Sequence, residues 1–240
     1  MDCLGIMARE GNQLGKVNQA RPAGRPRGGE AMRVLVACEE SQEVCKAFRE
    51  LGHEAYSCDI EPCSGGHPEW HLQVNALELL KMQWDLIIAH PPCTYMSKAG
   101  ARWMYPVAKQ VDPIRYARAM EAKKFFMQFL ETDCPKICVE NPRPLRVVGL
   151  PKPTQIIQPY EFGHPYSKAT LLWLKGLPPL EPTNVLTEYQ PYLPSNTGAF
   201  SKGGGGSRGV AHDAVTASKT FPGVAKAMAE QWGGICDGRH

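Results

Sequence analysis

The chain has 240 residues, of which 43% are hydrophobic and 21% charged, a composition typical of one folded domain with tails. Lysines and arginines exceed aspartates and glutamates by 27 − 24 = 3, so net charge neither demonstrates nor excludes a nucleic-acid partner. No run of about 18 apolar residues is present, which excludes a membrane-spanning helix, and residues 1–31 lack the apolar centre of a secretion signal.

The nine cysteines are odd in number and follow no export signal. Reduced thiols in a cytoplasmic protein therefore fit better than a disulfide framework, and one thiol could be a nucleophile. The composition changes along the chain predict four parts. These are a flexible basic tail over 1–31, a main domain over 32–182, a loop rich in proline and glycine over 183–212, and a C-terminal helix within 213–240 that packs back on the domain.

The main domain begins with a β-α-β unit. Residues 33–38 are a β-branched apolar run typical of a buried strand, residues 41–51 carry apolar side chains at helical spacing, and residues 54–58 form a second strand. Ser41 is the expected N-cap of the helix, and Gly52 supplies the conformational freedom that its C-terminus needs.

Strands and helices continue to alternate after this unit, which indicates an α/β fold with a mostly parallel sheet. The further elements expected in chain order are a helix over 73–82, a strand over 84–89, a long helix over 113–131, strands over 136–139, 154–158 and 169–174, and a helix over 221–232.

Residues that can do chemistry follow several of these strands, and in such sheets ligands bind outside the carboxyl ends of the strands. The segments concerned are Cys38-Glu39-Glu40, Asp59-Ile60, His90-Pro91-Pro92-Cys93 and Glu140-Asn141-Pro142. We expect them to meet at one edge of the sheet.

The turn after the first strand and the acid after the second strand indicate which kind of nucleotide-like ligand the chain could bind. Asp59 could accept hydrogen bonds from the hydroxyls of a ribose, or could be a solvated acid. The turn after Cys38 has no glycine and carries two carboxylates, which would repel a diphosphate. This argues against NAD or ATP and favours a ligand with a cationic centre and a free amine, such as S-adenosylmethionine.

Three further side chains are candidates for catalysis. Cys93 follows two prolines that fix a turn, and it could be a nucleophile or a structural thiol. Glu140 is flanked by apolar residues, so it could have a raised pKa and donate a proton, or it could be an ion-paired acid. Lys168 precedes a strand and could hold a phosphate or a base carbonyl, or be an exposed loop lysine.

The chain resembles the DNA methyltransferases that modify carbon 5 of cytosine, because it carries, in this order, Pro92-Cys93, Glu140-Asn141 and a basic residue before a strand. The chain looks most like compact phage- and prophage-type members of that family. The likeness spans about residues 33–234 and implies a Rossmann-like S-adenosylmethionine-dependent methyltransferase fold, mostly parallel with helices on both faces.

The resemblance also implies roles for individual residues. Cys93 would add to carbon 6 of cytosine, and Glu140 would engage N3. The cofactor would lie against Ala37, Cys38, Glu39, Asp59, Ile60, Asn75, Pro92 and Thr220. The substrate would contact Ser97, Asn141, Ser167 and Lys168. The partner would be DNA, either a duplex with the cytosine flipped out or a single strand, with no membrane involved.

The sequence departs from the family in several places. Pro142 and His90 replace the valine after Glu-Asn and the glycine before Pro-Pro-Cys, and Lys168 stands in place of arginines. The glycine-rich cofactor turn is absent. Only about 50 residues separate Lys168 from Thr220, too few for a large target-recognition domain. Specificity would then be slight, or supplied by a partner protein.

Several alternatives remain open. One is a catalytically silent protein of the same fold that binds nucleic acid or cofactor, and another is an enzyme acting on single-stranded DNA or free nucleotides. Methylation of an exocyclic amine is disfavoured, because its Asp/Asn-Pro-Pro-aromatic pattern is not matched. No metal site is expected, although Cys58, Cys63, His67 and His71 lie within 14 residues, because their spacing is not typical of zinc ligands.

Overall fold

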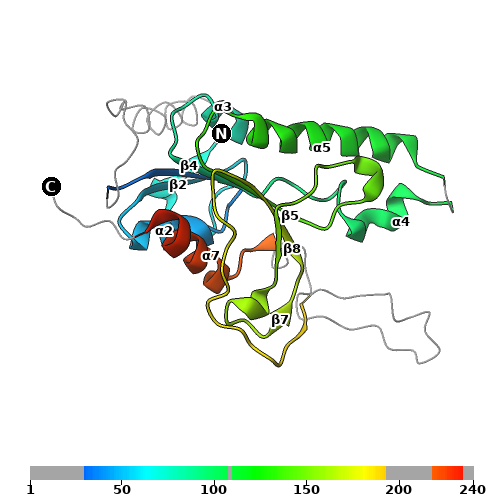
Figure 1. Cartoon of the computed structure of the whole chain (residues 1–240). Helices are drawn as coiled ribbons and strands as arrows, with labels where there is room; N and C mark the ends of the chain where they lie inside the picture. The colour runs from blue at the N-terminus through cyan, green and yellow to red at the C-terminus, as the bar shows by residue number, and fades with distance from the viewer. Residues whose placement is uncertain (1–29, 108–109, 193–217, 235–240) are drawn as a thin grey trace.

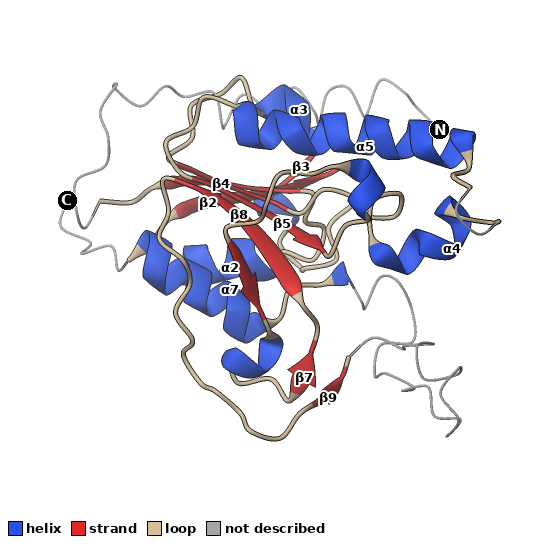
Figure 2. Ribbon diagram, turned by 45° about the vertical axis from the view of Figure 1, so that its right-hand side comes forward, coloured by secondary structure: helices blue, strands red, loops and turns tan. Residues whose placement is uncertain are grey.

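In a computed structural model, the chain forms a central sheet covered by helices on both faces (Figures 1 and 2). The structure describes residues 30–107, 110–192 and 218–234. Within these ranges, none of the helices combines the length and the apolar character that crossing a membrane requires. The predicted tail over 1–31 lies almost wholly outside the described residues, as does most of the predicted loop over 183–212.

The main sheet has seven strands in the order β3-β2-β1-β4-β5-β8-β6. The first five of these pair in parallel, and β8 is antiparallel to both of its neighbours. This Rossmann-like arrangement confirms the predicted fold class. The strands are β1 (Arg33–Ala37), β2 (Glu54–Asp59), β3 (His71–Gln73), β4 (Leu86–Ala89), β5 (Ile137–Pro142), β6 (Gln155–Ile157) and β8 (Thr170–Lys175).

Helices α3 and α5 cover one face of the sheet, and α2 and α7 cover the other (Figure 2). Short 3-10 turns and a small parallel sheet of β7 and β9 complete the described part. The helices are α2 (Glu43–Glu50), α3 (Ala76–Leu79), α4 (Ala101–Met104), α5 (Pro113–Glu131), α7 (Pro222–Met228) and a π-helix, η5 (Ala229–Gly233). The 3-10 helices are η1 (Pro68–Trp70), η2 (Lys98–Gly100), η3 (Arg146–Val148) and η4 (Pro159–Glu161), and the small sheet joins β7 (Tyr166–Ser167) to β9 (Gln190–Pro191).

The core consists of two hydrophobic layers, one on each side of the sheet. Phe126 and Phe129 of α5 are fully buried in one layer, and Phe48 of α2 is fully buried in the other together with Met228 of α7. The central strands are buried on both faces because helices cover both sides, and this is why they read as continuous apolar runs. The strand ends are therefore held by a rigid scaffold.

The C-terminal segment packs back on this scaffold. Helix α7 lies beside α2 (Figure 1), and Trp232 of the following π-helix donates a hydrogen bond from Nε1 to the carbonyl of Pro178 over 3.0 Å. The predicted helix over 221–232 is thus present, but its second half is a π-helix and not a regular α-helix. Residues 218–221, which precede this helix, line the pocket that is described below.

Several predicted boundaries are wrong for physical reasons. The first helix begins at Glu43, and Ser41 is not its N-cap. Gln42 precedes the helix with a φ of 60°, and the capping carboxylate comes from Glu39. The helix expected over 73–82 is shorter, because β3 extends to Gln73 and α3 covers four residues only.

Two other predictions hold. The long helix runs from Pro113 to Glu131 as expected, because Asp112 caps it and accepts a hydrogen bond from the backbone N–H of Arg115 over 2.7 Å. Gly52 has a φ of 86°, which is the left-handed conformation expected after the first helix.

Candidate active site

The carboxyl ends of β1, β4 and β5 lie side by side because these three strands are parallel neighbours. His90, the first residue after β4, donates its backbone N–H to the carbonyl of Ala37 at the end of β1, over 2.9 Å. Glu140 is part of β5 itself, since β8 pairs with this strand through Pro142. The strand predicted over 136–139 is therefore longer, and the acid is fixed by a sheet ladder.

The loop that carries Cys93 is fixed at both of its ends. The backbone N–H groups of Met96 and Ser97 donate to the carbonyl of Cys93 over 3.0 and 2.9 Å and close a turn. The side-chain amide of Asn141 donates to the carbonyl of Pro91 over 2.8 Å. The backbone that carries Cys93 is thus held in place, and the residue is partly exposed.

Glu140 forms a buried pair with His90. The distance from His90 Nδ1 to Glu140 Oε2 is 3.2 Å, and the two side chains are 10% and 17% exposed. Burial raises the pKa of Glu140, but the hydrogen bond from His90 and the charges of His90 and Lys168 outweigh burial and lower it. The expectation that Glu140 has a raised pKa is therefore wrong, because it overlooked the histidine 50 residues upstream.

The electrostatic surroundings of Cys93 favour its protonated thiol form over the thiolate. Burial raises its pKa, and the carboxylate of Glu140 raises it further, whereas Lys168 and a hydrogen bond with Ser97 lower it. Ionisation of Cys93 would become easier if the charge on Glu140 were neutralised. The two groups are thus electrostatically linked.

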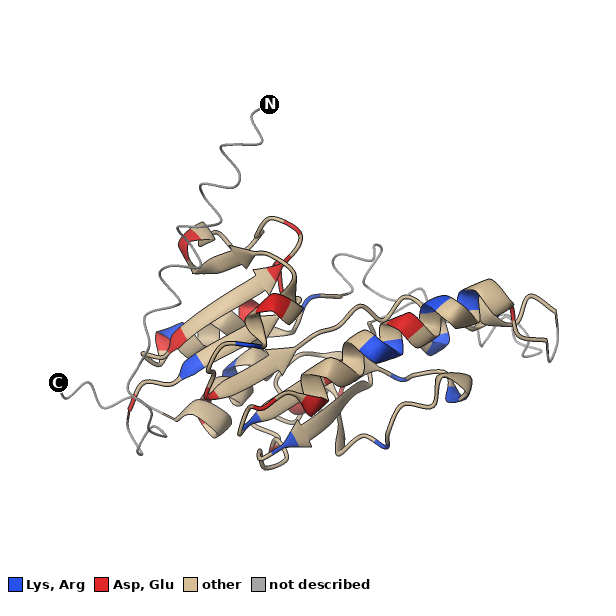
Figure 3. Cartoon of the chain, turned by 90° about the horizontal axis from the view of Figure 1, so that it is seen from above, with Lys and Arg blue, Asp and Glu red and all other residues tan. Residues whose placement is uncertain are grey.

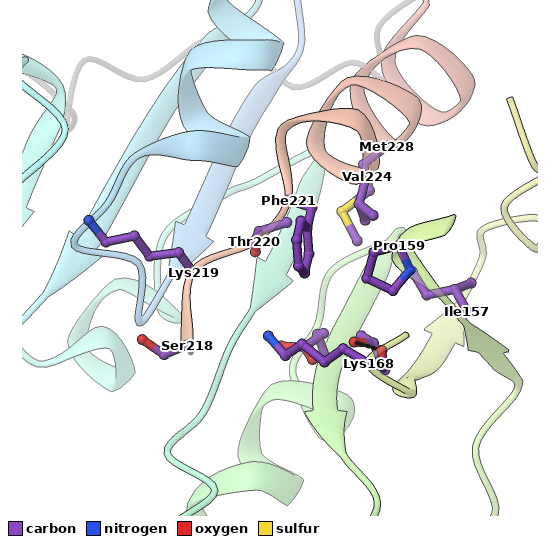
Figure 4. A pocket seen from close by; sticks show the side chains of 11 residues that line it. Ile157, Pro159, Lys168, Ser218, Lys219, Thr220, Phe221, Val224 and Met228 are labelled. Atoms are coloured by element: carbon purple, nitrogen blue, oxygen red, sulfur yellow. Dashed lines mark hydrogen bonds between the residues drawn. The ribbon is translucent and has the colours of Figure 1, made fainter. Parts of the chain in front are cut away.

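Lys168 lines a pocket together with Glu140 and lies near the ring of Phe221 (Figure 4). Its Nζ lies 5.7 Å from the ring centre of Phe221 and 5.9 Å from that of Tyr192. Burial lowers its pKa, while the negative charge of Glu140 acts in the opposite direction. Lys168 is therefore part of the pocket, and the alternative of a freely exposed loop lysine is wrong.

The pocket brings together segments that are far apart in the sequence. Its lining comes from β5, from the residues around η4 and β8, and from the approach to α7. In Figure 4, Phe221 lies over the space above Lys168, and Thr220 lies next to it. The lining residues are Glu140, Ile157, Pro159, Lys168, Thr170, Ser218, Lys219, Thr220, Phe221, Val224 and Met228.

The residues expected to hold a cofactor lie around the ends of β1 and β2. They differ in whether their side chains are already engaged in contacts within the fold. The carboxylate of Glu39 is buried and accepts hydrogen bonds from the backbone N–H groups of Val44 over 2.7 Å and Cys45 over 3.2 Å. This side chain caps α2, so the predicted cofactor contact of Glu39 is wrong for its carboxylate. Burial also raises its pKa, which lessens the predicted repulsion of a diphosphate.

Asp59 and Ile60 remain available at the end of β2. Asp59 accepts a hydrogen bond from the backbone N–H of Glu61 over 3.1 Å, which leaves room on its other carboxylate oxygen, and Ile60 is 70% exposed. Asn75 is exposed and caps α3, because its side-chain oxygen accepts from the N–H of Leu77 over 3.1 Å. Its amide nitrogen remains available for another contact.

The remaining predicted site residues have the following positions. Ala37 is buried in β1, Pro92 is exposed, and Ser97 and Asn141 are buried next to the Cys93 loop. Ser167 is half-buried in β7, immediately before Lys168. Asn141 and Ser97 thus support the loop from within.

Two features of the site were not identified from the sequence. His90 was placed among the strand-end residues and noted as a departure from the family pattern, but it was given no role in the site. Tyr166, Tyr192 and Phe221 form an aromatic cluster, with ring centres of Tyr192 and Phe221 4.7 Å apart. They come from separate segments, and no local pattern in the sequence connects them.

The histidines and cysteines weighed as metal ligands have other roles. His71 lies 2.9 Å from the hydroxyl of Ser57 and 2.9 Å from the carbonyl of Glu61, and His67 stacks on Trp70. Among the described residues, no three His, Cys, Asp or Glu side chains are grouped to hold a metal ion.

Comparisons with known proteins give little more. No family model matches the chain, and no curated protein matches it. A solved structure described as the S. pombe Dnmt2 methyltransferase is similar over 62% of this chain, at 13% sequence identity and a TM-score of 0.37. The chain spans about half of that structure, since the match covers 51% of it. The assignment of the fold rests on the order and direction of the strands.

Proposed function

We propose that this protein transfers a methyl group from S-adenosylmethionine to carbon 5 of cytosine in DNA, with Cys93 as nucleophile and Glu140 as the group that engages N3. The observation that carries the proposal is the convergence of Cys93, Glu140 and Lys168 at one sheet edge. These are a thiol, a carboxyl group and a cation, and their charges influence one another. They are the groups that covalent activation of a pyrimidine requires.

The first step activates the base. The Cys93 thiol loses its proton to solvent, and the thiolate forms a bond to carbon 6 while the C5=C6 electron pair moves toward C4 and N3. Glu140, once its carboxylate has taken up a proton, delivers that proton to form the N3–H bond, and Lys168 balances negative charge on the ring. The product is an enamine with a nucleophilic carbon 5.

The later steps complete the transfer. S-adenosylmethionine, when bound, would supply a methyl group on a positively charged sulfur; carbon 5 would bond to that methyl carbon as the S–C bond breaks, with a neutral thioether as the leaving group. The proton on carbon 5 then passes to solvent, the C5=C6 bond forms again, and the Cys93 thiolate leaves. The proton on N3 returns to Glu140, which releases it, and Cys93 takes up a proton from solvent, so the protein ends in its starting state.

The residues near β1 and β2 are compatible with this cofactor. Asp59 has a carboxylate oxygen free for ribose hydroxyls, and the exposed Ile60 beside it offers an apolar surface for adenine. The glycine-free turn is less of an obstacle than its two acids suggest, since Glu39 is occupied by α2. The strand order, with a reversed strand next to the last one, is that of the methyltransferase fold.

A basic and aromatic surface next to the Cys93 loop supports a nucleic-acid substrate. Helix α4 follows this loop and exposes Arg102 and Trp103. The guanidinium carbon of Arg102 lies 4.5 Å from the ring centre of Trp103. Arg115 of α5 joins this surface to the loop by donating to the carbonyl of Thr94 over 2.7 Å. Figure 3 shows further lysines and arginines along α5. Exposed rings with cations are typical of surfaces that bind unpaired bases and phosphates.

The direct test is a methyl-transfer assay with radiolabelled S-adenosylmethionine and four substrates, namely duplex DNA, single-stranded DNA, RNA and free deoxycytidine nucleotides. We expect label in 5-methylcytosine from at least one of the DNA substrates, and none with the Cys93→Ala variant. If wild-type protein binds the cofactor and DNA but transfers no label to any of the four, the protein is a silent binding protein and the proposal fails.

A further inference from the structure

His90 lies between the two sides of the candidate active site. Its backbone is bonded to the end of β1, and its imidazole Nδ1 lies 3.2 Å from the carboxylate of Glu140 on β5. The side chain is 10% exposed. The resemblance to cytosine methyltransferases does not account for this residue, because the corresponding position there is glycine.

The other ring nitrogen of His90, Nε2, is buried and makes no hydrogen bond within the described part of the chain. A buried polar atom without a partner costs about 1–3 kcal/mol, so this imidazole is not explained as a device for folding stability. It is the kind of group that a functional site retains at a cost.

Charged groups from three elements act on His90. Burial lowers its pKa, but the hydrogen bond and charge of Glu140 on β5 and the charge of Glu39 after β1 raise it overall, against the opposing charge of Lys168 before β8. These directions favour a protonated His90 next to an ionised Glu140. A proton on Nδ1 of His90 lies within hydrogen-bond distance of the Glu140 carboxylate.

We propose that His90 supplies the proton that Glu140 delivers to N3 of cytosine, so that the two side chains work as a proton-donating pair. This inference rests on the proposed function. The Nδ1–H bond of His90 breaks as the O–H bond of Glu140 forms, and that proton moves on to N3 when the Cys93 thiolate adds to carbon 6. After Cys93 leaves, the proton returns along the same route. Neither oxidation nor reduction takes place.

The same proton transfer would also make it easier for the Cys93 thiol to ionise. The Glu140 carboxylate raises the pKa of Cys93, so a permanently ionised Glu140 would oppose the nucleophile beside it. A proton that moves from His90 onto Glu140 removes that opposing charge at the stage when the thiolate is needed. The pair would therefore assist both the acid and the nucleophile.

The pair is tested first without turnover, by NMR titration of histidine-labelled protein. The His90 signal is assigned by its absence from the His90→Asn variant. We expect His90 to titrate above 6.5 in the wild type and below 6.5 in Glu140→Gln, because burial dominates once the carboxylate is removed. The matched control is Glu69→Gln, which removes the exposed carboxylate 3.1 Å from His67 Nδ1 and should leave the His90 signal unchanged. A His90 signal that is unaffected by Glu140→Gln would overturn the pair.

The proton-supplying role is tested with the His90→Gly variant, which restores the glycine of the related family. We expect methyl transfer at neutral pH to fall on the order of a hundredfold, the effect of losing a general-acid contribution, and added imidazole to restore part of the rate. The alkaline limb of the pH profile should move to lower pH, whereas His67→Asn should leave both rate and profile unchanged. Thermal unfolding checks that the variant is folded, and His90→Asn replaces it if it is not.

The outcomes separate the two proposals. A His90→Gly enzyme with the rate and pH profile of the wild type overturns the role of His90 and leaves the proposed function intact. A wild-type protein that transfers no methyl group to any nucleic acid overturns the proposed function, and the proton-supplying role falls with it, even if the NMR titration shows the pair.

Discussion

The side-chain amide of Asn141 donates a hydrogen bond to the carbonyl of Pro91 over 2.8 Å, across 50 residues of sequence. Asn141 is 1% exposed and directly follows Glu140 on β5, while Pro91 begins the bend that carries Cys93. Together with the backbone bond from the N–H of Leu145 to the carbonyl of Met96 over 2.7 Å, this contact holds the loop with the thiol against the strand with the acid. The spacing of the two candidate groups is therefore set by the fold.

The first prediction concerns this contact. Replacing Asn141 by leucine keeps the size of the side chain but leaves the Pro91 carbonyl unpaired, so we expect a loss of about 1–3 kcal/mol in the free energy of unfolding. Urea denaturation measures it. Gln73→Leu is the control, because it removes an exposed amide-to-carbonyl bond of 3.1 Å and should change stability by less than about 0.5 kcal/mol. Equal effects of the two variants would contradict the account.

The second prediction concerns the cap of α2. Glu39→Ala removes the acceptor of two buried N–H groups at the start of this helix, so we expect a destabilisation of about 1–2 kcal/mol in thermal or urea unfolding. Glu50→Ala, at the exposed end of the same helix, is the matched control and should have little effect. A stable Glu39→Ala variant would mean that the helix does not depend on this carboxylate.

The third prediction is a pH dependence of stability. The pKa of Glu140 is lowered from 4.5, so the pair contributes stability above that value and loses it as pH falls through the folded-state pKa. The pKa of His90 is raised from 6.5, so the contribution is complete below 6.5 and is lost as pH rises through the folded-state pKa.

The stability difference between wild type and Glu140→Gln should therefore be largest between about pH 4.5 and 6.5 and should shrink on both sides. Urea unfolding at a series of pH values measures this difference. A difference that is constant from pH 4 to pH 9 would show that the two side chains do not form an ion pair.

The fourth prediction concerns Asp59. Removal of its carboxylate in Asp59→Ala should weaken S-adenosylmethionine binding by about 1–3 kcal/mol, the cost of leaving ribose hydroxyls without their acceptor. Isothermal calorimetry measures it, and Glu61→Ala, an exposed acid two residues away, is the control. Unchanged affinity in Asp59→Ala would move the cofactor to another part of the sheet edge.

The alternating elements could be predicted from the sequence because buried parallel strands leave continuous apolar runs. The strand-end rule also selected Cys93 and Glu140 correctly as neighbours at one edge. The cap of α2 could not be predicted, since it depends on the non-glycine residues Cys38 and Gln42 adopting φ values of 59° and 60°. No local pattern of residue types specifies that conformation.

The electrostatics of the site depend on contacts that sequence spacing does not reveal. Glu140 looked like an isolated acid in an apolar strand, and the structure pairs it with His90 from another strand end. For Lys168 the sequence left open a substrate contact and an exposed loop position, and the structure places it near Tyr192 and Phe221, which follow it by 24 and 53 residues. Both differences arise from tertiary contacts.

The most direct test of the central claim is covalent trapping. DNA that contains 5-fluorocytosine cannot lose the substituent at carbon 5, so the bond between the nucleophile and carbon 6 persists after methyl transfer. With S-adenosylmethionine present, we expect wild-type protein to form a complex with this DNA that survives denaturing electrophoresis, with Cys93 identified as the linked residue by peptide mass spectrometry. If no such complex forms although the protein binds both ligands, or if Cys93→Ala forms it equally well, Cys93 is not the nucleophile.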